Sequence, residues 1–388
     1  MRLLTAIFIL AACTVNAQKP SSGFYLARSS GRLTMLGAGL GEDRLGGAKL
    51  GYIDTAILLK IIDSTKELYK VQLSQYHAAF VAKADVRKDT VGKLKPYYLT
   101  GSISVKGDET YDYINISLSE KLPYISWMEI NPSKIVFDIY GVQSNTNWIS
   151  QLKGAREIKD VYLNQVEDDI VRVTVQLKHL QHWGYTLGYK NSTLSLRVRR
   201  QPTALKFSNM FIAIDAGHGG SNMGAGSSNG KSIEKNYTLR YANELEKYLK
   251  SKGASVVMTR TTDTTISNVD RVLQLQDVMP DLLISLHFNS SANANIKGVS
   301  TYYKHIGFKP VTVAILDRML QLPLSEFGNV GNFNFTLNAP TDFPNSLVEI
   351  GFLSNSEDET KIIDPRFQRA VAKKIYKGIK DWIKMVKE

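Results

Sequence analysis

Two histidines and two glutamates stand in short contexts that suit metal-dependent hydrolysis. His218 lies in Asp-Ala-Gly-His-Gly-Gly, Glu234 in Glu-Lys-Asn, His287 in Ser-Leu-His-Phe-Asn and Glu349 in Val-Glu-Ile-Gly-Phe. Two imidazoles and one carboxylate are a sufficient protein shell for a catalytic zinc ion, which keeps a fourth position for water. A second carboxylate nearby can take the proton from that water. These residue types therefore favour a zinc hydrolase.

The elements that must position these residues alternate between strands and helices. Short apolar runs predict buried strands, and apolar residues at helical spacing predict amphipathic helices. Such alternation is typical of an α/β domain, with a mostly parallel sheet and helices on both of its faces. The predicted strands are 211–215, 255–259, 281–286 and 346–350, and the predicted helices include 241–249 and 367–382.

The four residues fall where such a sheet would bring them together. His218 follows the first strand, His287 ends another and Glu349 lies within a third, while Glu234 opens the helix that contains Tyr237. Ligands of open α/β sheets bind in the crevice at the carboxyl ends of the strands. Taken singly, each residue also has a structural interpretation as a turn residue, a helix cap or a surface carboxylate.

The order and flanks of the four residues resemble the zinc-dependent N-acetylmuramoyl-L-alanine amidases, which cut peptidoglycan. The resemblance runs from Phe207 to the C-terminus and rests on the four separate motifs. It implies that His218, Glu234 and His287 bind one zinc per chain and that Glu349 is the catalytic glutamate. The occurrence of all four in the family's order favours the metal site over the structural interpretations.

Three further residues are candidates for support around the metal ligands. Asp215 is expected to orient an imidazole, and Asn289 and Arg271 are the other candidates. Arg271 falls where the family has a helix arginine, and Arg260 where it has Thr-Arg.

The chain departs from the family at two places. Phe288 stands where the family commonly has alanine after the second histidine, so we expect a bulky ring at the mouth of the cleft. Residues 332–338 read Asn-Phe-Asn-Phe-Thr-Leu-Asn where the family often has an arginine, which changes the expected substrate contacts on that side.

Two small all-β domains are expected before the α/β domain. Residues 24–93 hold short apolar runs between polar turns, and they resemble a bacterial SH3-like module at 69–73 and 79–81, although a generic barrel or sandwich fits nearly as well. Residues 97–200 show period-two alternation and resemble, at 134–141 and 172–175, the AMIN domain that precedes many such amidases. The α/β catalytic domain is then expected at 207–388.

The N-terminus predicts export. Residues 1–17 hold a basic residue, an apolar run of about ten and a small-x-small end, as a secretory signal peptide does. A buried N-terminal element and lipid attachment at Cys13 are the alternatives. The mature chain is expected to have no transmembrane helix and to act in the periplasm or cell envelope of a bacterium.

The charge is unevenly distributed. The whole chain carries a formal charge of +12, of which residues from Phe207 onward contribute +3 and the earlier residues +9. A basic front half favours an anionic partner such as cell-wall polymer or lipid headgroups. Nucleic acid is not expected, because no basic run, zinc knuckle or aromatic RNA platform is present.

Together these patterns predict an exported amidase that hydrolyses the bond between N-acetylmuramic acid and L-alanine in peptidoglycan, during cell-wall turnover or daughter-cell separation. A zinc peptidase acting on wall peptides and a non-catalytic wall-binding protein remain the alternatives. Activator-dependent relatives carry an inserted helix between the second histidine and the catalytic glutamate, and the interval from His287 to Glu349 leaves no room for one.

Overall fold

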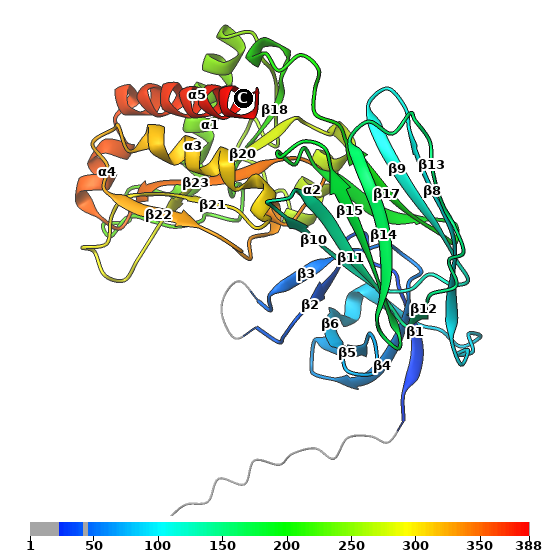
Figure 1. Ribbon diagram of the computed structural model, residues 1–388. Helices are drawn as coiled ribbons and strands as arrows, with labels where there is room; N and C mark the ends of the chain where they lie inside the picture. Colours follow the sequence, from blue (N-terminus) through cyan, green and yellow to red (C-terminus); the bar gives the residue numbers. More distant parts are fainter. Residues whose placement is uncertain (1–22, 42–45, 388) are drawn as a thin grey trace, which may run out of the picture.

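The computed structural model describes residues 23–41 and 46–387 (Figure 1). The predicted signal peptide at 1–17, with Cys13, lies outside these residues. Among the helices of the described ranges, none is long and apolar enough to cross a membrane.

The first β unit is a seven-stranded antiparallel sheet in the order β3-β2-β6-β5-β4-β1-β7. Buried residues alternate with more exposed ones along most of its strands, so one face packs inward. Its elements are β1 (Tyr25–Ser29), β2 (Thr34–Gly37), β3 (Lys49–Ile53), β4 (Leu58–Ser64), β5 (Leu68–Gln72), β6 (Ala78–Ala82), the 3-10 helix η1 (Lys83–Asp85) and β7 (Val86–Lys88).

The second β unit consists of two sheets. One has the order β10-β11-β15-β14, and the other has the order β12-β8-β9-β17-β16 with β13 paired to β8. The strands are β8 (Tyr98–Gly107), β9 (Tyr111–Leu118), β10 (Tyr124–Glu129), β11 (Lys134–Tyr140), β12 (Val142–Gln143), β13 (Ile149–Gln151), β14 (Ile158–Glu167), β15 (Ile170–Leu177), β16 (Tyr185–Lys190) and β17 (Thr193–Arg199).

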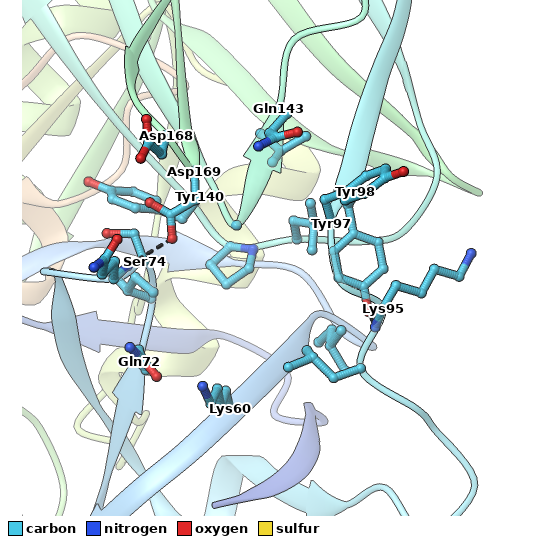
Figure 2. Close-up of a pocket in the computed structure, with 18 of the residues that line it drawn as sticks. Lys60, Gln72, Ser74, Lys95, Tyr97, Tyr98, Tyr140, Gln143, Asp168 and Asp169 are labelled. Carbon is cyan, nitrogen blue, oxygen red and sulfur yellow. Dashed lines mark hydrogen bonds between the residues drawn. The ribbon is translucent and has the colours of Figure 1, made fainter.

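The two β units share one hydrophobic core. The buried cluster runs from Leu26 in the first sheet to Val198 in the last strand of the second unit. Their seam is only partly filled, because a cavity of about 330 Å³ lies between them, lined by side chains that include Gln72, Tyr97 and Asp168 (Figure 2). The units therefore pack as neighbours with a cavity of mixed polar and apolar lining at the seam.

The C-terminal unit is a six-stranded sheet in the order β19-β18-β20-β23-β21-β22, flanked by helices. All neighbouring strands of this sheet pair in parallel, except that β21 pairs antiparallel with β23. The strands are β18 (Phe211–Ala216), β19 (Ser255–Met258), β20 (Leu282–Asn289), β21 (Val299–Tyr302), β22 (Glu326–Val330) and β23 (Asn345–Phe352). The helices are η2 (Phe207–Asn209), α1 (Glu234–Ser251), α2 (Asn268–Val278), η3 (Ile306–Phe308), α3 (Lys309–Met319), η4 (Thr336–Asn338), α4 (Ser356–Ile362) and α5 (Pro365–Lys387).

Helices cover both faces of this sheet, as the alternating pattern predicts. Side chains alternate across a strand, so Ile212 and Ile214 of β18 enter the core with α1, α3 and α5, whereas Ala213 enters a smaller core with Leu275 of α2 and Leu337 of η4. Strands buried on both faces read as continuous apolar runs, which is why the sequence reveals them. The predicted α/β class, preceded by antiparallel β sheets, is confirmed.

The β units and the α/β unit are in direct contact. Trp382 of α5 donates a hydrogen bond to Gln181 (2.9 Å), and its ring centroid lies 5.2 Å from that of Trp183. Thr186 of β16 also donates a hydrogen bond to Asp342 (2.8 Å) across the interface. In Figure 1 the first sheet lies below the α/β unit, with β2 and β3 on the side nearest to it.

Candidate metal centre

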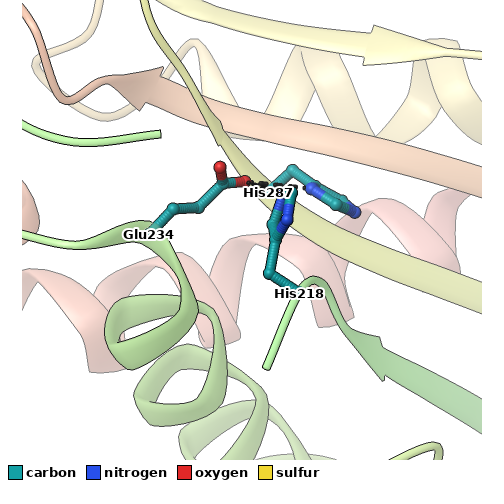
Figure 3. A group of neighbouring side chains, drawn as sticks. All are labelled: His218, Glu234 and His287. Atoms are coloured by element: carbon teal, nitrogen blue, oxygen red, sulfur yellow. Dashed lines mark hydrogen bonds and ion pairs between the residues drawn. The ribbon is translucent and has the colours of Figure 1, made fainter. Parts of the chain in front are cut away.

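His218, Glu234 and His287 meet at one end of the parallel sheet (Figure 3). His218 follows β18, Glu234 is the first residue of α1, and His287 lies near the end of β20. Nε2 of His218 is 3.1 Å and Nδ1 of His287 is 2.9 Å from the same carboxylate oxygen, Oε1 of Glu234. One potential ligand atom from each residue lies within 4.8 Å of the other two. Two imidazoles and one carboxylate from three distant segments thus converge on one point.

The Glu234 carboxylate is buried and held ionised. Its Oε1 also accepts a hydrogen bond from the backbone N–H of Phe288 (3.0 Å), and its Oε2 accepts one from that of Ala225 (2.6 Å). Burial by itself raises the pKa of Glu234, but the hydrogen bonds from His218 and His287 outweigh it and leave the pKa well below its usual range. For His218, burial lowers the pKa and the hydrogen bond to Glu234 raises it, and the net pKa is raised.

The surroundings of these three residues fit a metal ion. Nε2 of His287 is buried and has no hydrogen-bond partner among the described residues. A buried donor or acceptor left in that state costs about 1–3 kcal/mol, so a ligand that satisfies it is favoured. The donor set of two imidazoles and one carboxylate is that of a catalytic zinc site.

Two glycines leave room for the cluster. A Cβ atom at Gly217 would lie 2.2 Å from Cε1 of His287, and one at Gly224 would lie 2.5 Å from Oε2 of Glu234. Real Cβ atoms do not approach so closely, so the rings and the carboxylate occupy the space that any other residue would need. Glycine, which has no Cβ, therefore suits both positions.

Glu349 lies beside the cluster. On the neighbouring strand β23 it is the register partner of His287 on β20, and adjacent strands are about 4.8 Å apart. A cavity of about 390 Å³ lies at this end of the sheet, and its lining includes Glu349, the three clustered residues and Asn289. The structure therefore brings the four sequence-predicted residues to one cavity, with Glu349 outside the group of potential ligands.

Comparison with known proteins agrees with this geometry. Residues 212–381 match the family of N-acetylmuramoyl-L-alanine amidases, and residues 102–200 match the AMIN domain. The chain carries an N-acetylmuramoyl-L-alanine amidase domain behind an AMIN domain. The resemblance seen in the sequence motifs is confirmed for these two domains.

Individual relatives match the amidase domain. The probable cell wall amidases LytH of Staphylococcus epidermidis and Staphylococcus aureus are 35% and 36% identical over 172 residues, which cover 44% of this chain and 57% of theirs. The chain thus spans little more than half the length of these curated relatives.

Two similar solved structures are the catalytic domain of CwlV, an N-acetylmuramoyl-L-alanine amidase from Bacillus (Paenibacillus) polymyxa var. colistinus, and the N-acetylmuramoyl-L-alanine amidase of Clostridium difficile 630. Each is 30% identical, and 98% of each chain is covered. They match 45% and 46% of this chain with TM-scores of 0.43 and 0.44.

Two buried arginines of the amidase domain hold the turn that carries His218. Arg260 donates to the carbonyls of Ala216 (2.8 Å) and Gly217 (3.0 Å). Arg271 donates to the carbonyls of Ala216 (3.0 Å) and His218 (2.5 Å). His218 has a φ of +62°, which a non-glycine residue seldom adopts. These four hydrogen bonds stabilise that conformation and so set the direction of the imidazole.

Asp215 supports the site in a different way from the one expected. The sequence predicts that it orients an imidazole, but its oxygens accept hydrogen bonds from Arg271 (2.6 Å), Thr259 (2.7 Å) and Ser285 (2.6 Å). Asp215 lies inside β18, three residues before His218, and its carboxylate points toward these three neighbours. Burial raises the pKa of Asp215, but the Arg271 charge and these hydrogen bonds leave it lowered. Asp215 therefore acts on the turn through Arg271.

The ring partner of His218 is instead Asn222, which the sequence analysis missed. Oδ1 of Asn222 lies 2.9 Å from Nδ1 of His218. An asparagine four residues after a histidine belongs to no motif, so only the folded turn reveals it. Asn289, another expected supporting residue, accepts a hydrogen bond from the backbone N–H of Ser290 (2.9 Å) and lines the cavity.

Phe288 is not the bulky ring at the cleft mouth that the sequence predicts. Its side chain is 1% exposed, and its ring packs edge-on against Tyr241 of α1 at 5.0 Å between centroids. Successive side chains of a strand point to opposite faces, so His287 turns toward the cavity and Phe288 toward the helices. Phe288 borders the cavity with little exposed surface, and the other aromatic residues that line it are Phe333 and Phe335, from the segment that departs from the family.

Gly217→Ala tests the fit of the cluster to zinc. The added methyl must displace the His287 ring, so we expect zinc affinity to fall by roughly 10–100-fold, as for other changes that misorient a ligand. Gly226→Ala is the matched control, because its Cβ would meet only the Ser232 carbonyl at 3.8 Å. Chelator competition on the purified variants measures the affinities, and equal values for both would contradict the assignment.

Proposed function

We propose that this protein hydrolyses the amide bond between N-acetylmuramic acid and L-alanine of peptidoglycan, with one zinc ion held by His218, Glu234 and His287. The observation that carries the proposal is the convergence of these three residues on a shared point inside a domain of the amidase family. Neither part would suffice alone: the cluster suits several zinc hydrolases, and the family match does not place the residues.

The positions of the side chains support a separate role for each residue in the proposed reaction. When bound, zinc supplies Lewis-acid activation of a water molecule and of the scissile carbonyl. Glu349, across the strand pair from His287, takes the proton from the attacking water and returns it to the nitrogen of the leaving amine. An amide needs both transfers, because its amine leaves poorly unless protonated. Arg260 and Arg271 keep His218 in place while this happens.

The remaining parts of the chain are assigned to export and wall binding. In this proposal residues 1–17 are a signal peptide, residues 24–93 an SH3-like domain, residues 97–200 the AMIN domain and residues 207–388 the catalytic domain. The chain then acts in the periplasm or cell envelope, in wall turnover or daughter-cell separation. The net charge of +9 before Phe207 favours adhesion to anionic wall material or lipid headgroups.

The cavity is open to substrate without an inserted helix above it. The structure describes the whole interval from His287 to Glu349. Its α-helix is α3, which packs on α5 and β21 and contributes no residue to the lining of the cavity. This arrangement supports activity without an activator protein.

Product analysis of digested peptidoglycan tests the proposed reaction. We expect free stem peptides that begin with L-alanine, detected by mass spectrometry after treatment with the zinc-loaded protein. Cleavage within the stem peptide would indicate a zinc peptidase instead. Wall binding with no released product would indicate a non-catalytic protein.

Substitution of two residues separates metal binding from proton transfer. Glu349→Gln keeps the size of the side chain but removes the base, so we expect zinc content to stay and turnover to fall by roughly 10²–10⁴-fold. His287→Ala should lose zinc and activity together. Metal analysis paired with initial rates measures both effects, and near-normal turnover of Glu349→Gln would show that another group is the base.

A further inference from the structure

One wall of the catalytic cavity is a short aromatic segment between β22 and η4. Phe333 and Phe335 both line the cavity. The Phe335 ring meets the His287 ring edge-on at 5.2 Å between centroids. The Phe333 ring stacks on that of Phe335 at 6.2 Å and packs against Tyr302 at 4.4 Å. We call Phe333 and Phe335 the aromatic wall. The position of the aromatic wall relative to the metal ligands depends on the hydrogen bonds that the segment makes with its neighbours.

Asn334, between the two phenylalanines, is held by the first β sheet. Its side-chain oxygen accepts a hydrogen bond from the backbone N–H of Lys49 (2.8 Å). Its side-chain nitrogen donates to the carbonyls of Gly47 (2.9 Å) and Gly46 (3.2 Å). Its own backbone carbonyl accepts a hydrogen bond from Nζ of Lys49 (2.6 Å). Four hydrogen bonds therefore tie the middle of the wall segment to residues nearly three hundred positions earlier in the chain.

Backbone hydrogen bonds within the amidase domain hold the two phenylalanines on either side of Asn334. The backbone N–H of Phe333 donates to the carbonyl of Tyr303 (3.0 Å), and the carbonyl of Phe335 accepts from the N–H of Asn338 (3.2 Å). Neither bond fixes the residue between the two rings. In Figure 1 β3, which begins at Lys49, lies on the side of the first sheet that faces the α/β unit, in agreement with these contacts.

We propose that residues 46–49, which lead into strand β3 of the first β sheet, are part of the amidase site, as a positioning element that fixes the aromatic wall through Asn334. The proposal rests on the proposed function, because it concerns how that site binds a muramyl peptide. The wall lies beside His287 and carries no group for proton transfer, so it contacts a part of the substrate that does not react. Its apolar faces suit a sugar ring or the methyl groups of the stem peptide.

The expected kinetic effect follows from this role. Without the Asn334 contacts, substrate binding must order two aromatic side chains that the first sheet otherwise holds in place. Such an interaction is the same in the ground state and the transition state, so its loss raises KM and leaves kcat nearly unchanged. We expect an increase in KM of roughly 5–20-fold.

The test uses the full-length, zinc-loaded protein with soluble muramyl peptide as substrate. Asn334→Ala removes the side-chain contacts, and Lys49→Met removes the contact made by Nζ while it keeps the backbone of β3. Arg32→Ala is the matched control, since it breaks the exposed ion pair with Asp270 of α2 (2.8 Å), which joins the same two units without involving a residue of the aromatic wall. Zinc content, KM and kcat are measured for each variant, together with hydrogen exchange of the backbone amides of residues 333–336.

The proposal expects Asn334→Ala and Lys49→Met to have a higher KM and faster amide exchange at residues 333–336. Their kcat and zinc content should stay unchanged, and Arg32→Ala should behave like the wild type. The Asn334→Ala and Lys49→Met effects should also be non-additive in the double variant, because both act on one contact. A KM in both variants equal to that of Arg32→Ala would overturn the proposal while the proposed function stands. Absence of hydrolysis by the wild type and Arg32→Ala would overturn the proposed function and this inference with it.

Discussion

A buried carboxylate shared by two imidazoles dominates the architecture of the site. Moving an ionised carboxylate out of water costs several kcal/mol unless it is paired and hydrogen-bonded. Glu234 meets that requirement through His218, His287 and the backbone N–H groups of Phe288 and Ala225. Its place at the start of α1 adds the favourable end of the helix dipole. Each of these partners has to arrive from a different segment, so the fold must bring the segments together.

The buried residues around the cluster hold the turn that brings His218 to Glu234. His218 must leave β18 in a left-handed conformation, and Arg260 and Arg271 bond the carbonyls of that turn. Arg271 is itself a buried cation, and Asp215 balances its charge. Removal of one partner of such a buried pair typically costs 3–5 kcal/mol, because the other charge stays behind without compensation. Asp215 and Arg271 are therefore as necessary to the site as the residues that point into it.

Much of this could be predicted from the sequence, for physical reasons. Strands buried on both faces produce continuous apolar runs, so the alternation of such runs with helical patterns predicts the α/β class. His218, Glu234, His287 and Glu349 lie at or near the ends of those elements, and parallel strands end at a common edge. Their convergence in one cavity follows from that topology, while their individual roles, and the SH3-like interpretation of residues 24–93, remain predictions.

Other features could not be predicted because they depend on side-chain direction or on distant contacts. Phe288 was expected at the cleft mouth, yet strand alternation turns it into the core. Asp215 accepts hydrogen bonds from Arg271 of α2 and Ser285 of β20 rather than from an imidazole. Tertiary packing brings these two residues to Asp215, and the local sequence does not show it. The contact between Asn334 and Lys49 joins residues 285 positions apart, and no local pattern signals it.

We propose above that His218, Glu234 and His287 together form one zinc site. X-ray absorption at the zinc edge of the purified protein tests it most directly. We expect two imidazole nitrogens at about 2.0–2.1 Å and a carboxylate oxygen at about 2.0–2.2 Å from the zinc, and we expect His287→Ala to have lost the zinc-edge signal together with its zinc. A spectrum without imidazole ligands, or a His287→Ala variant that keeps its zinc and the same spectrum, would contradict this assignment.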